Sequence, residues 1–315
     1  MSEPLLGTER WPVPPGAHVE RLEMPDGTGI RAVRWTPEAA TRGTVVVLNG
    51  RTEYLEKYNE THAALLERGF AVASFDWRGQ GLSDRPLPDR LKGHVARFDC
   101  YLEDLDQLQD DFIVPHCPAP FTMLAHSLGG NLGLRALARR PGFFERAILS
   151  APMWCVGAGL RIPGPMRVGL AVAHALGLGK LAPPRGSGPN DPRFERFEEN
   201  GLTSDPERFL ETREMLRAEP RLSLGSPTID WFRLAVASMD LLFEPGWPEA
   251  IETPICICTP GADQIVSPAA QEALACRLPR AELHRFEGAQ HELLIERDEF
   301  RNAFWQRFDA FFGVT

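Results

Sequence analysis

A serine near the middle of the chain has the surroundings of a catalytic nucleophile. Ser127 lies in the sequence AHSLGG (residues 125–130), between an apolar run and a stretch with helical spacing. A nucleophilic serine needs a sharp, strained turn between strand and helix, so that its hydroxyl projects above the sheet. Small residues two positions away on each side, here Ala125 and Gly129, let the strand and the helix approach closely. Glycine is usual at both positions, so Ala125 is a departure from the common pattern.

A serine hydroxyl is a weak nucleophile and requires a general base, which in turn requires an orienting acid. The histidines that follow Ser127 are His174, His284 and His291. His284 lies within a predicted strand and His174 within an apolar segment, whereas His291 follows the last predicted strand, where a loop can place it over the serine. Asp263 follows another strand directly. We therefore predict Ser127 as nucleophile, His291 as base and Asp263 as the orienting acid, in the chain order typical of this chemistry.

Attack by the serine on an acyl carbon would create a negatively charged oxygen that backbone amides must stabilise. One amide is that of Leu128, directly after the nucleophile. The second is expected from the loop after the strand at 44–48, where Gly50 permits a close turn and the Arg51 amide follows. This chemistry requires no metal ion and no organic cofactor.

Strands and helices are predicted in turn around these residues. Residues 18–23 and 30–35 flank a glycine-bearing turn and predict a hairpin, while the proline-rich residues 1–16 predict a loosely packed opening. From the strand at 44–48 onward, apolar runs alternate with helical spacing, which is typical of a mostly parallel, doubly wound α/β sheet. The other predicted strands are 70–75, 121–125, 146–150, 254–259 and 282–286, and the predicted helices include 58–66, 102–112, 128–140, 269–277 and 300–312.

The alternation is interrupted between two predicted strands. It stops near Pro152 and resumes at residue 254, so we predict an α/β core at 17–152 and 251–315 with a helical lid at 153–250. Loops at the carboxyl ends of such strands carry the ligand sites of α/β sheets. The apolar stretch at 168–178 is therefore interpreted as a lid helix over the active site.

Composition excludes several function classes. The net charge of −9 and the pI near 5.5 argue against nucleic acid as a partner, since phosphate binding needs a basic face. The first residues lack the pattern of a signal peptide, and no apolar run is long enough to span a membrane. We therefore expect a cytoplasmic protein that can associate with the membrane periphery. The cysteines are scattered without metal-site spacing and are predicted to be buried free thiols.

Taken together, four motifs resemble the lysophospholipase/monoacylglycerol lipase branch of the α/β-hydrolases. The segment NGRTEYLEKY at 49–58 is similar in outline to the branch's H-G-x-x-E-H-x-x-R-Y, with Asn49 and Arg51 in place of the usual histidine and a small residue. DWRGQGLS at 76–83, AHSLGG at 125–130 and GADQIV at 261–266 are similar to its other motifs. We interpret Asp76, Arg78 and Ser83 of the second motif as a brace for the sheet.

The resemblance implies the α/β-hydrolase fold and a serine hydrolase that cleaves carboxylic esters of single-chain acyl lipids through an acyl-enzyme. It ranks lysophospholipid slightly ahead of monoacylglycerol as the small-molecule substrate. A small-ester carboxylesterase or an amidase is the alternative within enzymes. A catalytically silent hydrolase fold that binds a ligand is the alternative from another class.

The lid sequence suggests a second property. Residues 152–190 contain no acidic residue, but they contain Arg161, Arg167, Lys180 and Arg185 around the apolar stretch at 168–178. Cationic and apolar residues together favour transient contact with a lipid surface. We also hypothesise that Arg51 or these lid residues contact a phosphodiester head group.

Overall fold

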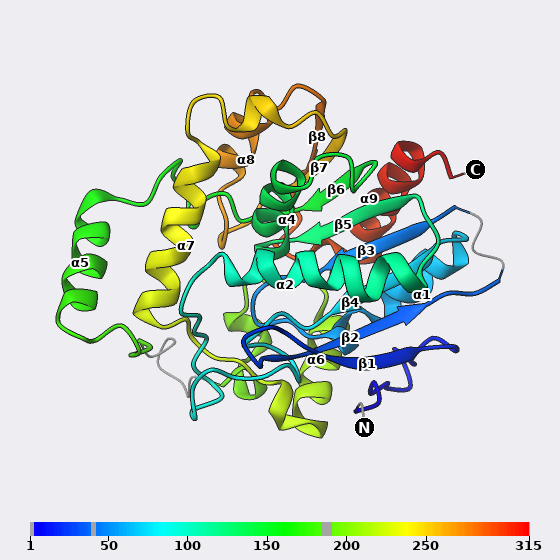
Figure 1. The fold of residues 1–315 in the computed structure, drawn as a ribbon, viewed down its shortest axis with the longest axis horizontal. Coiled ribbons are helices and arrows are strands. Elements are labelled where there is room, and N and C mark those ends of the chain that lie inside the picture. Colours follow the sequence, from blue (N-terminus) through cyan, green and yellow to red (C-terminus); the bar gives the residue numbers. More distant parts are fainter. Residues whose placement is uncertain (1–2, 39–41, 184–190, 315) are drawn as a thin grey trace.

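The computed structural model describes residues 3–38, 42–183 and 191–314, and these form one eight-stranded sheet in the order β1-β2-β4-β3-β5-β6-β7-β8. β1 pairs antiparallel with β2, and β2 antiparallel with β4, whereas the strands from β4 to β8 are parallel (Figure 1). The mostly parallel α/β fold predicted from the sequence is confirmed. The strands are β1 (His18–Glu23), β2 (Gly29–Trp35), β3 (Thr44–Leu48), β4 (Ala71–Phe75), β5 (Phe121–His126), β6 (Ala147–Ser150), β7 (Ile255–Pro260) and β8 (Ala281–Phe286).

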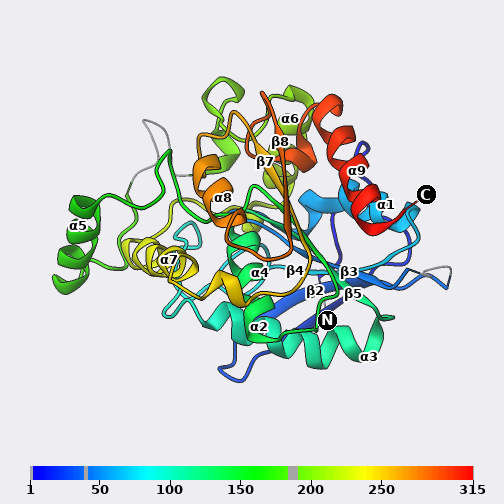
Figure 2. The same ribbon diagram turned by 90° about the horizontal axis from the view of Figure 1, so that it is seen from above.

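Helices cover both faces of this sheet (Figures 1 and 2). On one face, α1 (Asn59–Glu67) and α9 (Asp298–Phe312) bury apolar side chains with β3, β4 and β7. On the other face, α2 (Cys100–Leu108), α4 (Leu128–Arg139) and α8 (Pro268–Ala275) form the larger core cluster. Because both faces are covered, the strands carry continuous apolar runs, as in Thr44–Leu48, which is wholly buried.

Three longer helices lie between β6 and β7. These are α5 (Gly164–Ala175), α6 (Pro206–Ala218) and α7 (Ile229–Leu242). α7 packs into the core cluster through Trp231 and Met239, whereas α5 stands apart from the sheet beyond α7 in both views (Figures 1 and 2). We propose residues 153–250 as a lid on a core made of 17–152 and 251–315.

Short helical elements complete the described chain. α3 (Val114–His116) follows a π-helical turn at Gln109–Ile113 that continues α2. Turns of 3-10 helix lie at Leu55–Tyr58, Pro192–Phe194, Phe197–Glu199, Pro220–Leu222, Pro248–Ala250 and Leu293–Ile295. Within the described residues, no helix is both long and apolar enough to cross a membrane.

The prediction of a loosely packed opening holds for most of residues 3–16, which are exposed or half-buried, but not for Trp11 and Pro14, which are buried, while residues 1–2 lie outside the described part. Trp11 is only 1% exposed and packs with Tyr54 and Met215. The Asn59 side chain donates hydrogen bonds to the carbonyls of Leu6 and Trp11 at 3.0 and 3.2 Å. Proline made the segment look irregular, but an irregular segment packs well when a large aromatic side chain anchors it.

The prediction of buried thiols holds for all the cysteines but one. Cys276, at the end of α8, is exposed, and the others are buried.

Candidate active site

The turn between β5 and α4 has the strained geometry expected for an exposed nucleophile. Ser127 has φ +51° and ψ −112°, a backbone conformation that L-residues rarely adopt. Its amide donates to the Ser150 carbonyl at 3.1 Å, and its carbonyl accepts from the amides of Gly130 and Met153, both at 2.9 Å. These bonds from β6 and α4 hold the strained residue in place.

Close approach of α4 to the sheet depends on the glycine two residues after Ser127. A Cβ atom on Gly129 would lie 2.1 Å from the backbone oxygen of Leu48, so Gly129→Ala should destabilise the fold by about 3 kcal/mol or more through overpacking. Gly133, one turn later, is the matched control. There a Cβ would meet the flexible Met123 thioether, so Gly133→Ala should change stability by only about 1 kcal/mol. Urea unfolding measures both, and equal stabilities would contradict the argument.

The structure brings together the three side chains predicted to form the triad. His291 Nε2 lies 3.0 Å from Ser127 Oγ, and His291 Nδ1 lies 2.7 Å from Asp263 Oδ2. The second carboxylate oxygen of Asp263 accepts from the amides of Ile265 and Val266 at 2.8 and 3.0 Å, which fixes the carboxylate. Ser127 is 7% exposed, and the Asp263 side chain is fully buried. This constellation can move a proton from serine to histidine.

The other two histidines considered lie elsewhere. His174 in α5 contacts Asp230 of α7 at 2.6 Å, and His284 in β8 contacts Glu282 at 3.3 Å.

Burial and neighbouring charges act in opposite directions on His291. Burial alone lowers its pKa, but the Asp263 carboxylate outweighs burial, so the pKa is raised above 6.5. A general base must be neutral, so we expect kcat/KM to fall as the pH drops through a value above 6.5. Asp263→Asn removes the raising charge and should move this acid limb to lower pH. A pH–rate profile tests both, and a wild-type limb below pH 6.5 would contradict the assignment.

The loop after β3 packs against the nucleophile turn. A Cβ on Gly50 would lie 3.0 Å from a ring carbon of His126, directly before Ser127. Gln80 holds the loop, accepting from the Thr52 amide at 3.3 Å and donating to the Gly50 carbonyl at 2.9 Å. The predicted Arg51 donor lies in this fixed segment.

The other predicted donor, the Leu128 amide, belongs to the first turn of α4. Amides of a first helical turn have no acceptor within the helix and point toward a ligand. Both predicted amides are thus in segments that border Ser127.

The Arg51 side chain reaches into the lid. Its Nη2 donates to the Gly225 carbonyl at 2.7 Å, and the guanidinium lies 5.0 Å from the centre of a Trp231 ring in α7. A head group would have to compete with both contacts for this guanidinium. The sequence did not reveal this link between the loop after β3 and the lid, because its partners lie 174 positions apart or more.

A buried lysine connects the two loops that flank the site. Lys57 Nζ donates to Glu53 at 2.8 Å and to Glu292, the neighbour of His291, at 2.6 Å. Glu53 in turn accepts from the Gly50 amide and from the Tyr58 hydroxyl. Burial opposes ionisation of Glu53, but Lys57 outweighs it and holds the carboxyl pKa at about 2. Sequence analysis missed this cluster, although Glu53, Lys57 and Tyr58 lie in the motif at 49–58.

The interpretation of the motif at 76–83 as a brace is confirmed. The Asp76 carboxylate accepts from the Arg31 side chain at 2.8 Å and from the Leu55 and Leu82 amides, both at 2.9 Å. The Ser83 hydroxyl donates to the Asp76 carbonyl at 2.7 Å. These bonds tie β2, the end of β4 and the loop after β3 together.

Arg78 acts in the same way at the surface, donating to Asp26 at 2.7 Å and to Asp104 of α2 at 2.6 Å.

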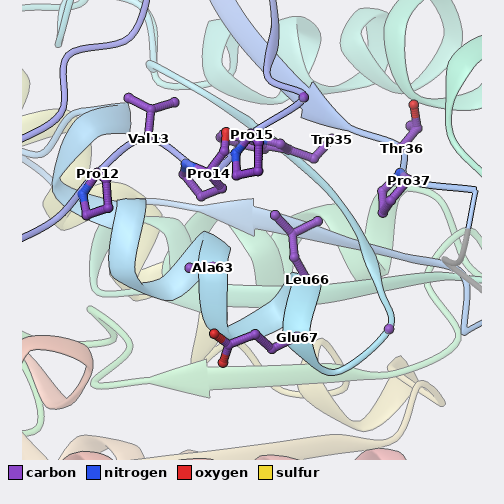
Figure 3. Close-up of a pocket in the computed structure, with 12 residues that line it drawn as sticks. Pro12, Val13, Pro14, Pro15, Trp35, Thr36, Pro37, Ala63, Leu66 and Glu67 are labelled. Carbon is purple, nitrogen blue, oxygen red and sulfur yellow. Dashed lines mark hydrogen bonds between the residues drawn. The ribbon is translucent and has the colours of Figure 1, made fainter.

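A separate cavity of about 730 Å³ lies between the opening segment and α1, and Figure 3 shows prolines and Leu66 facing it. Trp35 on its wall ends β2 and pairs with Val72, near the start of β4. The cavity is therefore at the amino end of the parallel strands, whereas Ser127 lies at the carboxyl end of β5. This cavity is distinct from the triad.

Comparison with known proteins agrees with this architecture. The profile of the family described as "Serine aminopeptidase, S33" matches residues 39–298, most of the chain. The chain belongs to this family of α/β-hydrolases, in the branch similar to lysophospholipases and monoacylglycerol lipases, and is by class a carboxylic ester hydrolase.

Individual relatives share 30% or less of their sequence with this chain. Lysophospholipase L2 of Escherichia coli K12 is 30% identical over 306 residues, which cover 91% of this chain and 85% of the relative. A monoacylglycerol lipase of Mycolicibacterium smegmatis is 25% identical over 86% of this chain and 89% of its own length. A soluble variant of monoglyceride lipase from Saccharomyces cerevisiae has the same fold, with a TM-score of 0.74 and 19% identity, over 94% of this chain and 96% of that one.

Proposed function

We propose that Ser127 attacks an ester carbonyl while His291 takes its proton, and that Asp263 orients and stabilises the charged histidine. The contacts of 3.0 and 2.7 Å within the triad support these roles. The amides of Leu128 and Arg51 stabilise the developing oxyanion. His291 then protonates the leaving alcohol, and a water molecule, activated by the same histidine, releases the acid from Ser127.

We propose lysophospholipid as the preferred substrate. The observation that carries this choice is the similarity to lysophospholipase L2 over nearly the whole chain, higher than that to monoacylglycerol lipase.

A substrate panel tests this choice. We expect kcat/KM for a lysophospholipid to exceed that for the monoacylglycerol with the same acyl chain and for a short-chain ester. A preference for monoacylglycerol or short esters would overturn lysophospholipid as the substrate, but the protein would still be an ester hydrolase. Faster cleavage of an aminoacyl amide than of any ester would overturn the proposed reaction.

We also propose that the lid touches a lipid surface through α5. None of its residues is buried, and Val168, Val172 and Leu176, the residue directly after α5, lie on one side at 63%, 52% and 69% exposure. Large apolar side chains gathered on one surface mark an interaction site. The interpretation of this helix as a cover over the active site gains no support from its burial, because no residue of α5 is buried. α7 carries the buried Trp231 and the contact to Arg51, while α5 packs on its outer side.

One of the basic residues predicted to contact a lipid surface has a different role. Arg167 donates to Asp240 of α7 at 2.6 Å, so its charge already has a partner within the lid. Arg161 and Lys180 are exposed, lie before and after α5 in the sequence, and suit anionic head groups. Arg185 lies outside the described residues.

Replacing Val168, Val172 and Leu176 together by serine should lower the partition coefficient onto anionic vesicles by about tenfold or more, since each buried apolar side chain contributes roughly 1.5–3 kcal/mol. Leu210→Ser is the matched control, because Leu210 in α6 is also 50% exposed. Co-sedimentation with vesicles of phosphatidylglycerol measures the effect. Equal binding of the triple variant and wild type would reject the contact.

A further inference from the structure

Side chains of the types that bind metal ions meet on the last two strands of the sheet. β7 and β8 are parallel, and their register pairs Cys256 with Glu282 and Cys258 with His284. Side chains two residues apart in a strand point to the same face. Both cysteines and Phe286 belong to the core on the α1/α9 side, so Glu282 and His284 face that side as well.

Three of these side chains are close enough to share one ion. The Cys256 sulfur, a carboxylate oxygen of Glu282 and a ring nitrogen of His284 all lie within 4.8 Å of one another. A tetrahedral zinc ion, with bonds of about 2.0–2.3 Å, separates its ligands by roughly 3.3–3.8 Å. Small side-chain rotations are therefore sufficient to bring the three groups onto one ion.

An ion can reach this cluster from solvent. Cys256 forms the buried floor, whereas the Glu282 side chain is 51% exposed and that of His284 is 26% exposed. β8 is the edge strand of the sheet, so the cluster opens at the side of the molecule. Among the described residues, Glu282 forms an ion pair with His284, and no arginine or lysine neutralises the Glu282 carboxylate.

A second cluster shows what a neutralised arrangement looks like. Glu53, His126 and Glu292 also lie within 4.8 Å of one another, but Lys57 already provides a cation to both carboxylates. Within the described part of the chain, Cys256, Glu282 and His284 form no such contact with a lysine.

We propose that Cys256, Glu282 and His284 bind a zinc ion, with water as the fourth ligand. A thiolate, an imidazole and a carboxylate form a donor set that zinc prefers. Cys256 binds as thiolate and releases its proton to solvent, so binding weakens at low pH.

The ion would act on stability rather than on bond cleavage. β7 leads into the loop that carries Asp263, and β8 leads into the loop that carries His291. An ion bound by residues of both strands would hold the edge strand β8 against β7. It would stabilise the folded state by an amount that grows with the logarithm of the free zinc concentration once this exceeds the dissociation constant.

Cobalt titration tests the site. The full chain, stripped of metal by a chelator and kept reduced, should bind one equivalent of Co²⁺ with a near-ultraviolet thiolate-to-cobalt band, and Zn²⁺ should displace it. His284→Gln removes a ligand. It should therefore lower the affinity for Co²⁺ by at least the roughly 10- to 100-fold that is lost when a residue that only orients a metal ligand is changed. Cys256→Ser should remove the thiolate band. Zn²⁺ should raise the Tm of wild type but not of either variant.

Cys276→Ser is the control, because Cys276 is the exposed cysteine. It should bind Co²⁺ as wild type does. Loss of the band in this control, an unchanged band in His284→Gln, or no band in wild type would each overturn the proposal. Should Cys256→Ser fold poorly, His284→Gln decides alone, because the His284 side chain is partly exposed and can be changed without opening a core cavity.

Discussion

Ser127→Ala should lower kcat for ester hydrolysis by roughly 10⁴- to 10⁶-fold, because it removes the atom that forms the acyl-enzyme. The hydroxyl lies 3.0 Å from the proposed base, and its backbone is held by bonds that alanine retains. The variant should therefore fold as wild type does. Labelling by a fluorophosphonate, which reacts covalently with an activated serine, should be complete in wild type and absent in the variant.

Asp263→Asn separates orientation from nucleophilicity. An amide at this position cannot fix the productive tautomer of His291, so kcat should fall by roughly 10⁴-fold while Ser127 is still present. Slow labelling of this variant, against none in Ser127→Ala, would support the assigned roles. Labelling of Ser127→Ala at the wild-type rate would place the nucleophile elsewhere, and an unlabelled wild type would favour a ligand-binding protein over an enzyme.

Lys57→Met should be among the most destabilising substitutions, costing about 3–5 kcal/mol, because it leaves two carboxylates buried without a cation. Lys57 is the shared partner of Glu53, which holds the Gly50 amide, and of Glu292, beside His291. Its loss should loosen both loops, so kcat should fall while KM changes little. Thermal unfolding and kinetics well below the Tm of each variant measure the two effects.

Glu292→Gln is the milder companion of Lys57→Met. It keeps an acceptor for the Lys57 ammonium while removing one buried charge, and burial raises the pKa of Glu292, so the lost charge costs little. This variant should retain most of the stability and a measurable kcat. If Lys57→Met had wild-type stability and kcat, the lysine would have no positioning role.

Much of the fold can be read from local sequence. Continuous apolar runs such as Thr44–Leu48 identify strands buried on both faces. The bounds of the predicted strands differ from those of the observed strands by about one residue or less. The proposed triad of Ser127, Asp263 and His291 was predicted in the same way. Each lies at the end of a strand, and the carboxyl ends of parallel strands meet at one edge of the sheet.

The rest depends on contacts between distant positions. Lys57 and Glu292 are 235 residues apart, and no periodicity indicates that they meet. α5 was predicted as a cover, since an apolar stretch suggests burial, but the structure leaves most of its apolar side chains exposed. The Cys256 cluster escaped notice because its ligands come from two strands, where the informative spacing is the register between β7 and β8.

The lid is anchored unevenly. Arg208 in α6 bonds to Glu60 of α1 and Asp298 of α9, and the Tyr54 hydroxyl donates to the Thr212 carbonyl of the same helix. α5 is joined to its neighbour mainly through Arg167 and His174, near the surface. Local opening begins where buried contacts are few, so we expect the amide hydrogens of α5 to exchange through fluctuations that leave α6 closed. The outer helix can thus tilt toward an interface without the fold around Ser127 coming apart.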